Sequence, residues 1–299
     1  MSNILISGGS GMIGRHLISH FNDRGHKPAF LSRSGSIKGI DAKGFKWDPY
    51  NRSIDESAFR DTDVLVNLAG AGIADERWTE KRKLEIHDSR IKTTKFLAEY
   101  LKDQQIHLKT VVSASAIGYY GDSGDEMMTE NDNAGNNFLS KVCEDWEQEA
   151  LKFKDVCDNL IILRLGIVLA KEGGALPETL NKAFFGVASY LGDGSQYYSW
   201  IHIDDLSSMF SFVIENSISG TYNAVAPNPV TNKAFTRSIK QNSRKVIAAL
   251  PAPGFAIRLV LGEMSTMVLD TQRCSSEKIE KSGFAFNYND VDSALSDLL

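Results

Sequence analysis

The sequence predicts an α/β protein with a doubly wound parallel sheet and a smaller mixed lobe. Short runs that are apolar on both faces alternate with longer helical patterns through roughly the first half of the chain. Such runs suit strands that helices cover on each side, and β-α-β alternation predicts parallel pairing. A glycine-rich turn at residues 8–14, directly after the first run, is typical of the same architecture.

The individual elements follow from the hydrophobic period. The predicted strands are residues 3–7, 27–32, 64–69, 110–114 and 160–165. Apolar residues at three- and four-residue spacing predict helices at residues 12–24, 79–103 and 136–154, and a shorter one at 206–214. Glycines and aromatic residues then become frequent between residues 173 and 200, which marks the start of the second lobe.

Composition and charge exclude several classes of protein. The 33 basic and 38 acidic residues give a net charge of −5, which argues against a nucleic-acid binder with a basic face. The richest apolar stretch, residues 160–170, is interrupted by Arg164, so we expect no membrane-spanning segment. The three cysteines lack metal-ligand spacing, and the N-terminus does not read as a cleavable leader. We therefore expect a reduced, cytoplasmic protein.

The strongest local motif is Ser7-Gly8-Gly9-Ser10-Gly11-Met12-Ile13-Gly14-Arg15. Gly8, Gly11 and Gly14 form a Gly-x-x-Gly-x-x-Gly pattern between a strand and a helix. There the chain must turn sharply, and its backbone must approach a pyrophosphate at the N-terminus of the helix. The motif predicts a Rossmann-type dinucleotide site, to which Met12 and Ile13 add the first N–H groups of the helix.

The end of the second strand indicates which dinucleotide binds. A site for NAD usually has a carboxylate there, which accepts a hydrogen bond from the ribose 2′-hydroxyl. Here the segment Phe30-Leu31-Ser32-Arg33-Ser34 contains none, and Arg33 can bind a 2′-phosphate with help from Ser32 and Ser34. NADP is therefore predicted rather than NAD. The alternative is that Arg33 is a plain surface charge.

Four further segments support a resemblance. They are Asn67-Leu68-Ala69-Gly70, Ser113-Ala114-Ser115-Ala116, Arg164-Leu165-Gly166-Ile167-Val168 and Trp200-Ile201-His202-Ile203-Asp204-Asp205. With the glycine-rich turn, they resemble the extended short-chain dehydrogenase/reductase superfamily, the NAD(P)-dependent epimerases and dehydratases of nucleotide sugars. Gly118-Tyr119-Tyr120-Gly121 and Gly283-Phe284-Ala285-Phe286 extend the likeness over the whole chain, to the "epimerase family" branch with its own C-terminal module.

The change in composition after Arg164, where glycines, aromatic residues and then prolines become frequent, predicts a division of the chain. Residues 1–165 are expected to form the NADP-binding Rossmann domain, to which residues 165–240 add later strands. A substrate-binding lobe is expected over residues 166–250, and the C-terminal module over residues 251–299.

The resemblance breaks down at the expected catalytic base. Members of the superfamily use a Tyr four residues before a Lys, together with a Ser from the end of the preceding strand. The pKa of this Tyr is lowered, so that its phenolate takes a proton from a substrate hydroxyl. Lys141 and Ser115 match this pattern, but Asn137 stands in the position of the base and cannot accept a proton near neutral pH. Tyr119 and Tyr120 are alternative phenols, or aromatic residues that pack in a turn. For Lys141 the alternative is a surface ion pair with Glu144 and Asp145.

Other residues are candidates by position. Leu68, Ala69 and Gly70 are expected beneath the cofactor, and Arg90 near its ribose. Arg164, Trp200 and His202 are candidates for substrate contact, with core packing as the alternative for Trp200. His202 with Asp204 and Asp205 resembles a metal trio, but an N-cap by one of the aspartates explains the pattern better, and no metal is predicted.

Two functions of different classes are consistent with these residues. One is an NADP-dependent epimerase or oxidoreductase acting by hydride transfer on a hydroxyl-bearing small molecule, with nucleotide sugars as one class. The other is a catalytically inactive NADP(H)-binding sensor or scaffold. We expect a monomer or homodimer that binds neither nucleic acid nor membrane.

Overall fold

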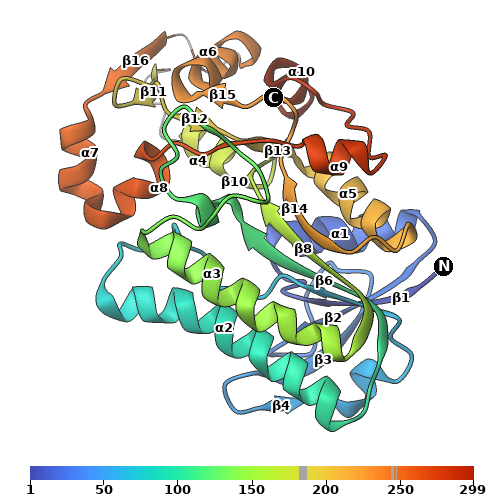
Figure 1. Ribbon diagram of the computed structural model, residues 1–299. Helices are drawn as coiled ribbons and strands as arrows, with labels where there is room; N and C mark the ends of the chain where they lie inside the picture. The colour runs from blue at the N-terminus through green and yellow to red at the C-terminus, as the bar shows by residue number, and fades with distance from the viewer. Residues whose placement is uncertain (182–186, 244–245, 247) are drawn as a thin grey trace.

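The computed structural model describes residues 1–181, 187–243, 246 and 248–299. A large sheet lies between two layers of helices, and a smaller lobe lies beyond the carboxyl ends of its central strands (Figure 1). This arrangement confirms the predicted α/β fold with a doubly wound sheet.

The main sheet has the strand order β14-β8-β6-β5-β1-β2-β3-β4. Its neighbouring strands pair in parallel, except for the short antiparallel pair of β3 and β4. The strands are β1 (Asn3–Ser7), β2 (Lys27–Ser32), β3 (Lys43–Asp48), β4 (Ser53–Ile54), β5 (Val64–Asn67), β6 (Leu108–Ala116), β8 (Cys157–Leu165) and β14 (Gly220–Ala224). The chain crosses over on either side of β1, so the carboxyl ends of β1 and β5 flank the point where ligands bind in such sheets.

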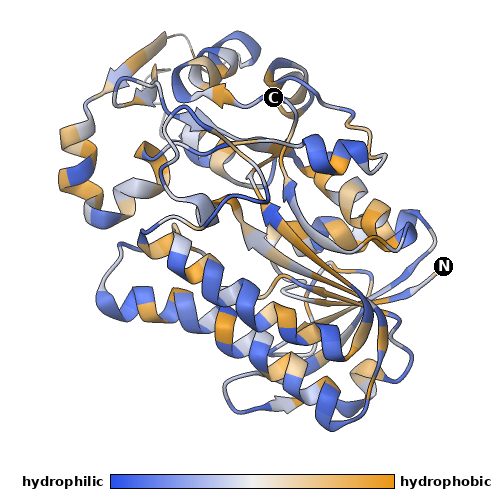
Figure 2. Ribbon diagram, in the orientation of Figure 1, coloured by the Kyte–Doolittle hydropathy of each residue, from blue (hydrophilic) through white to orange (hydrophobic). Residues whose placement is uncertain are grey.

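Each face of the sheet has its own apolar core. On one face, α1 (Met12–Asp23) and α5 (Ile203–Glu215) pack against the strands, and on the other lie α2 (Glu80–Asp103) and α3 (Phe138–Ala150). The strands between them are predominantly apolar, and the helices carry polar residues outward (Figure 2). Burial of both strand faces explains why these runs do not alternate in polarity.

Most predicted elements are confirmed, with shifted boundaries. β6 and β8 extend further toward their N-termini than predicted. Helix α3 begins at Phe138, because Asn137 is its N-cap and accepts the Ser140 N–H at 2.9 Å. Strand β3 was not predicted, because the predicted strands are runs that are apolar on both faces, whereas the residues of β3 alternate in polarity as in a half-buried strand. Strand β14 comes from the part of the chain after residue 165 and completes the other edge.

The smaller lobe combines short strand pairs with helices around a third core. Its strands are β9 (Ile167–Ala170), β10 (Gly173–Gly174), β11 (Val187–Leu191), β12 (Tyr197–Tyr198), β13 (Trp200–His202), β15 (Val230–Thr231) and β16 (Ala248–Ala252). Its helices are α4 (Ala175–Asn181), α6 (Asn232–Asn242) and α10 (Val291–Leu298).

The C-terminal segment joins the lobe to the main sheet. After α7 (Gly254–Leu261) and α8 (Thr266–Leu269), β17 (Arg273–Cys274) pairs with β7 (Met127–Met128), and α9 (Glu277–Lys281) follows. Phe284 and Phe286 belong to the same core as α1 and α5, so this segment packs against the first domain as well as the lobe.

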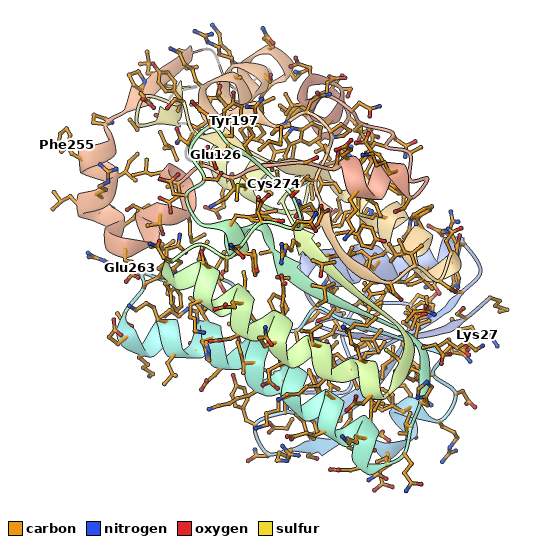
Figure 3. The ribbon with its side chains drawn as sticks, in the orientation of Figure 1. Lys27, Glu126, Tyr197, Phe255, Glu263 and Cys274 are labelled. Carbon is orange, nitrogen blue, oxygen red and sulfur yellow. The ribbon has the colours of Figure 1, made fainter. Side chains whose placement is uncertain are left out.

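Helix α7 is unusual in being apolar and uncovered. Phe255 and Leu259 are exposed, and Phe255 projects away from the body (Figure 3), whereas Met264 and Met267 further along the chain pack against the cluster around Trp78. None of the helices in the described ranges combines the length and apolar character that crossing a bilayer requires.

Candidate functional site

The glycine-rich turn makes a close contact between β1, β5 and α1. Gly8 has φ +77°, and a side chain there would lie 2.9 Å from the Leu68 carbonyl carbon. At Gly14, an added Cβ would collide with the Gly8 carbonyl oxygen and lie 2.7 Å from Gly9 Cα. The glycines therefore let the helix begin directly over the strand ends, as a dinucleotide site requires.

The N-terminus of α1 is open to a ligand. Its N-cap, Gly11, offers no side-chain acceptor, and the first turn, with Met12 and Ile13, holds no acidic residue. The first N–H groups of a helix lack partners within it and carry a partial positive charge. This end of the helix lies at the carboxyl end of β1 and fits a phosphate group.

The end of β2 carries the residues that were expected near the adenosine ribose. Arg33 and Ser34 are exposed, and the Ser34 hydroxyl donates to the Ser36 carbonyl at 2.6 Å. The Ser32 hydroxyl is buried, and within the described part of the chain it has no hydrogen-bond partner. Since buried polar groups are normally hydrogen-bonded, a hydroxyl without a partner here fits a ligand oxygen.

Small residues and one arginine line the end of β5. Leu68, Ala69 and Gly70 follow the strand, and the Arg90 guanidinium carbon would lie 3.0 Å from a Cβ added at Gly70. Arg90 donates to the Ile86 carbonyl at 3.0 Å and stacks over the Trp146 ring at 5.3 Å. Burial lowers the pKa of Arg90, and none of the described carboxylates pairs with it. A half-buried cation without an acidic partner can bind ribose or phosphate oxygens of a ligand.

At the ends of β6 and β8 lies a buried polar network. Ser115 and Arg164 are opposite each other in the sheet register, and both bind Glu147 of α3. Ser115 donates to Glu147 Oε1 at 2.7 Å, and two nitrogens of Arg164 each donate to the same carboxylate at 2.8 Å. Burial disfavours the charge of Arg164, but Glu147 outweighs that effect and raises its pKa.

Both candidate phenols contact Arg164. The Arg164 guanidinium lies 3.5 Å from the centre of the Tyr119 ring and donates to the Tyr120 hydroxyl at 2.9 Å. Tyr120 in turn donates to Asn223 of β14 at 2.7 Å, and burial raises its pKa. The Tyr120 hydroxyl is therefore held in the protein interior, and Arg164 is buried beneath the edge where it was expected to meet substrate.

Lys141 lies on the outer surface of α3. Its side chain is 64% exposed, and its ammonium contacts Asp145 at 2.7 Å and Glu144 at 3.2 Å. This is the surface ion pair named as the alternative, and the structure does not bring Lys141 together with Ser115. Asn137, four residues earlier, uses its side chain to cap the helix.

Trp200 and His202 are interior residues of the lobe. The Trp200 indole is fully buried and donates to the Asn228 carbonyl at 3.0 Å, the core-packing arrangement. His202, not an aspartate as predicted, is the N-cap of α5: its Nδ1 accepts the Asp204 N–H at 3.1 Å. Asp205 instead binds the C-terminal segment, accepting the N–H groups of Asn287 and Tyr288.

His202 also lies near Asp204 and Asp297, with one potential ligand atom from each within 4.8 Å of the others. Because Nδ1 accepts a hydrogen bond, Nε2 carries the proton and points toward Asp297 at 3.4 Å. A protonated nitrogen cannot bind a metal, so the observed contacts do not fit a metal ligand set.

Sequence reasoning missed Glu147 and Asp270. Glu147 lies on the face of α3 that buries Val142, Cys143, Trp146 and Ala150, and a carboxylate on such a face implies a buried cation. Arg164, which interrupts an apolar strand, was that cation. Asp270 lies in the connection after α8, more than a hundred residues from α3, and no local pattern marks it.

Comparison with known proteins agrees with this architecture. The family model described as "NAD dependent epimerase/dehydratase family" matches residues 4–224, and a "Domain of unknown function (DUF1731)" matches residues 252–298. An epimerase family protein of Mycobacterium leprae is 35% identical over 98% of this chain and 94% of its own length. The epimerase family protein YfhF of Bacillus subtilis is 35% identical over 99% and 98%, respectively.

Solved structures show the same fold. The human epimerase family protein SDR39U1, crystallised with NADPH, superposes with a TM-score of 0.88 at 28% identity over 99% of this chain and 98% of that one. The UDP-N-acetylglucosamine 4-epimerase of Bacillus cereus has a TM-score of 0.79 at 17% identity over 100% and 98%, respectively, a likeness of fold alone. With its glycine-rich turn, its sheet order and a family match over most of its length, this chain belongs to the NAD-dependent epimerase/dehydratase family.

Proposed function

We propose that this protein is an NADP-dependent epimerase or oxidoreductase that acts on a hydroxyl-bearing small molecule, with nucleotide sugars as the substrate class. The observation that carries the proposal is the open N-terminus of α1 above the tightly packed turn of Gly8, Gly11 and Gly14. When bound there, the coenzyme supplies the nicotinamide that accepts or donates hydride. A cytoplasmic location and a monomeric or homodimeric state stay predictions from the sequence.

The choice of NADP rests on the end of β2. Arg33 and Ser34 are exposed there, the Ser32 hydroxyl lacks a described partner, and the segment contains no carboxylate to bind a ribose hydroxyl. A planar guanidinium suits a 2′-phosphate. The human relative, crystallised with NADPH, agrees with this choice.

Substitution of Arg33 tests the cofactor preference. In Arg33→Glu, repulsion of the 2′-phosphate is expected to weaken NADPH binding by about 100-fold and NADH binding by less than about threefold. Calorimetric titration with both coenzymes measures the two affinities. Arg60→Glu makes the same charge change near the amino ends of the strands, just before β5, whereas Arg33 lies at the carboxyl end of β2, and it is the matched control. Equal losses of NADPH and NADH affinity in Arg33→Glu would contradict the proposed preference.

The alternative is an NADP(H)-responsive binding protein without turnover. It is favoured by the contacts of Ser115, Tyr120 and Lys141, all of which are engaged in pairs within the protein. Nicotinamide absorbance, followed with sugar nucleotides and small carbonyl compounds, distinguishes the two functions. Coenzyme binding without any turnover across that panel would support the binding protein.

A further inference from the structure

The connection between α8 and β17 brings a carboxylate to the start of α3. Asp270 ends α8, where its N–H donates to the Thr266 carbonyl at 3.1 Å. The next residue, Thr271, makes two hydrogen bonds. Its N–H donates to Asp122 at 3.1 Å, and its hydroxyl oxygen accepts the Tyr197 N–H at 2.7 Å. Asp122 belongs to the loop that follows β6 and Tyr197 to the smaller lobe, so this segment contacts both. The position of Asp270 is therefore set by both domains.

The orientation of Asn137 shows that Asp270 accepts a hydrogen bond. Asn137 Oδ1 accepts both the N–H and the hydroxyl of Ser140, at 2.9 and 3.0 Å. With the oxygen fixed by the helix cap, Asn137 Nδ2 must point the other way, and it donates to Asp270 Oδ2 at 3.1 Å. One amide thus anchors the carboxylate to the first turn of α3.

The charges around Asp270 leave it available for proton transfer. The Asp122 carboxylate from the loop after β6 and the Arg258 guanidinium of α7 are the charged groups that act on it, and no lysine or arginine among the described residues forms an ion pair with it. Burial and then Asp122 raise the pKa of Asp270, against the opposing effects of Asn137 and Arg258. Asp270 is nevertheless partly exposed.

The other side chains that are candidates for proton transfer either bind groups within the protein, lie on its outer surface or stay protonated. Lys141 is paired on the outer surface, and the Tyr120 hydroxyl is held between Arg164 and Asn223. Burial raises the pKa of Cys143 to about 12, so its thiol stays protonated. Asn137 cannot accept a proton near neutral pH.

We propose that Asp270 is the proton acceptor and donor of the reaction, which rests on the function proposed above. In the oxidising direction, the Asp270 carboxylate would take the proton of a substrate hydroxyl as the carbon that bears it becomes a carbonyl carbon, and in the reducing direction Asp270 would return that proton to oxygen. A bound nicotinamide coenzyme would supply the hydride acceptor in the first direction and the hydride donor in the second. The C-terminal segment thereby supplies the group that position 137 lacks.

The experiment measures NADPH-dependent reduction of 9,10-phenanthrenequinone, a generic carbonyl probe, between pH 5 and 8.5. Reduction needs the protonated acid, so kcat/KM of the wild-type protein should fall with rising pH above the pKa of Asp270. Asp270→Asn is expected to lower kcat by about 100-fold or more and to abolish this pH dependence, with NADPH affinity within about twofold of wild type. Asp270→Glu should recover part of the rate together with the pH dependence. Asp125→Asn, on the exposed part of the loop after β6, is the carboxylate control.

The outcomes separate the two proposals. Wild-type protein that binds NADPH but reduces no probe, with sugar nucleotides also inert, overturns the proposed function and this inference with it. Turnover that survives in Asp270→Asn with its pH dependence intact overturns the role of Asp270 alone. So does loss of NADPH affinity in step with the rate, or a rate that depends on Tyr119→Phe and not on Asp270→Asn.

Discussion

Glu147 and Arg164 show what a single buried charge requires. Each side chain is almost inaccessible to water, and each is satisfied by the other, with Ser115 and Tyr120 completing the hydrogen bonds. Taking charges out of water is costly, and only a close partner with good geometry compensates for it. The network therefore fixes the ends of β6, β8 and α3 relative to one another.

Breaking this pair is expected to destabilise the protein strongly. Glu147→Gln leaves the Arg164 guanidinium buried without a counter-charge, which should lower the free energy of unfolding by about 3–5 kcal/mol. Urea unfolding followed by fluorescence measures the change. Lys141→Gln breaks an exposed ion pair on the same helix and should leave the unfolding midpoint within error. If the two variants lose equal stability, the buried pair is not a major contributor.

Substitutions of Gly14 and Gly11 in the first turn should have different effects, because the space around the two glycines differs. An alanine Cβ at Gly14 meets the turn backbone, whereas at Gly11 its nearest neighbour is the Gly8 carbonyl oxygen at 3.4 Å. Gly14→Ala should therefore lower stability by about 1–3 kcal/mol, as overpacking does. Gly11→Ala should keep the wild-type unfolding midpoint and lose at least about tenfold in NADPH affinity, because the new methyl group obstructs the approach of the phosphates. Thermal unfolding and calorimetry measure the two effects; wild-type NADPH affinity in Gly11→Ala would contradict the placement of the phosphates.

At the scale of elements, helix α5 depends on a histidine for its first turn. His202 is almost completely buried, stacks on Tyr288, and caps the helix through Nδ1. Burial lowers the pKa of His202 below its ordinary 6.5, although Asp204 and Asp297 oppose the shift. The neutral imidazole is thus the form that the fold requires.

This dependence predicts a loss of stability in mild acid. Below about pH 6.5 the unfolded chain binds a proton at position 202 that the folded protein resists, so the free energy of unfolding falls as pH decreases. His202→Asn keeps a cap acceptor without the titration, and should lose less stability than wild type between pH 7.5 and 5.5. Urea unfolding across this range measures the difference, and His107→Asn, at an exposed histidine, controls for the loss of one imidazole. A parallel loss in wild type and His202→Asn would refute the assignment.

At the scale of the whole molecule, the C-terminal segment completes the domains that precede it. β17 pairs with β7 of the loop after β6, Phe284 and Phe286 enter the first core, and α10 packs into the third. Asp205, at the start of α5, accepts the backbone N–H groups of Asn287 and Tyr288 at 2.9 Å each. A segment matched by a separate family model is thus continuous in its packing with the rest of the molecule.

Removal of the Asp205 carboxylate should loosen this attachment. Asp205→Ala removes a buried carboxylate and leaves two backbone N–H groups of the C-terminal segment without their acceptor, which is expected to cost up to about 3 kcal/mol of global stability. The same variant should become more sensitive to limited proteolysis after residue 270. Asp204→Ala, at the half-exposed neighbour, is the matched control. Wild-type stability and protease resistance in Asp205→Ala would show that the segment is held by its apolar contacts alone.

The sequence by itself determined the sheet, its flanking helices and the dinucleotide turn, because these depend on local chemistry. Apolar runs of strand length, helical periodicity and the spacing of Gly8, Gly11 and Gly14 are properties of neighbouring residues, and they predicted β1, β2 and α1 almost to the residue. The same local reasoning predicts Arg33 as a cofactor contact from its place at the end of the second strand, and the family resemblance predicts Gly70 beneath the cofactor.

Only the tertiary structure decided which polar groups face one another. Ser115 and Lys141 are close in the expected motif, yet Ser115 of β6 binds Glu147 in the interior and Lys141 points to solvent, because Glu147 lies on the buried face of α3 and Lys141 on its exposed face. Asp270 reaches Asn137 only because the chain returns after 133 residues to pass beside α3. Hydrogen bonds and charges act over a few ångströms in space, and separation along the chain carries no information about that distance.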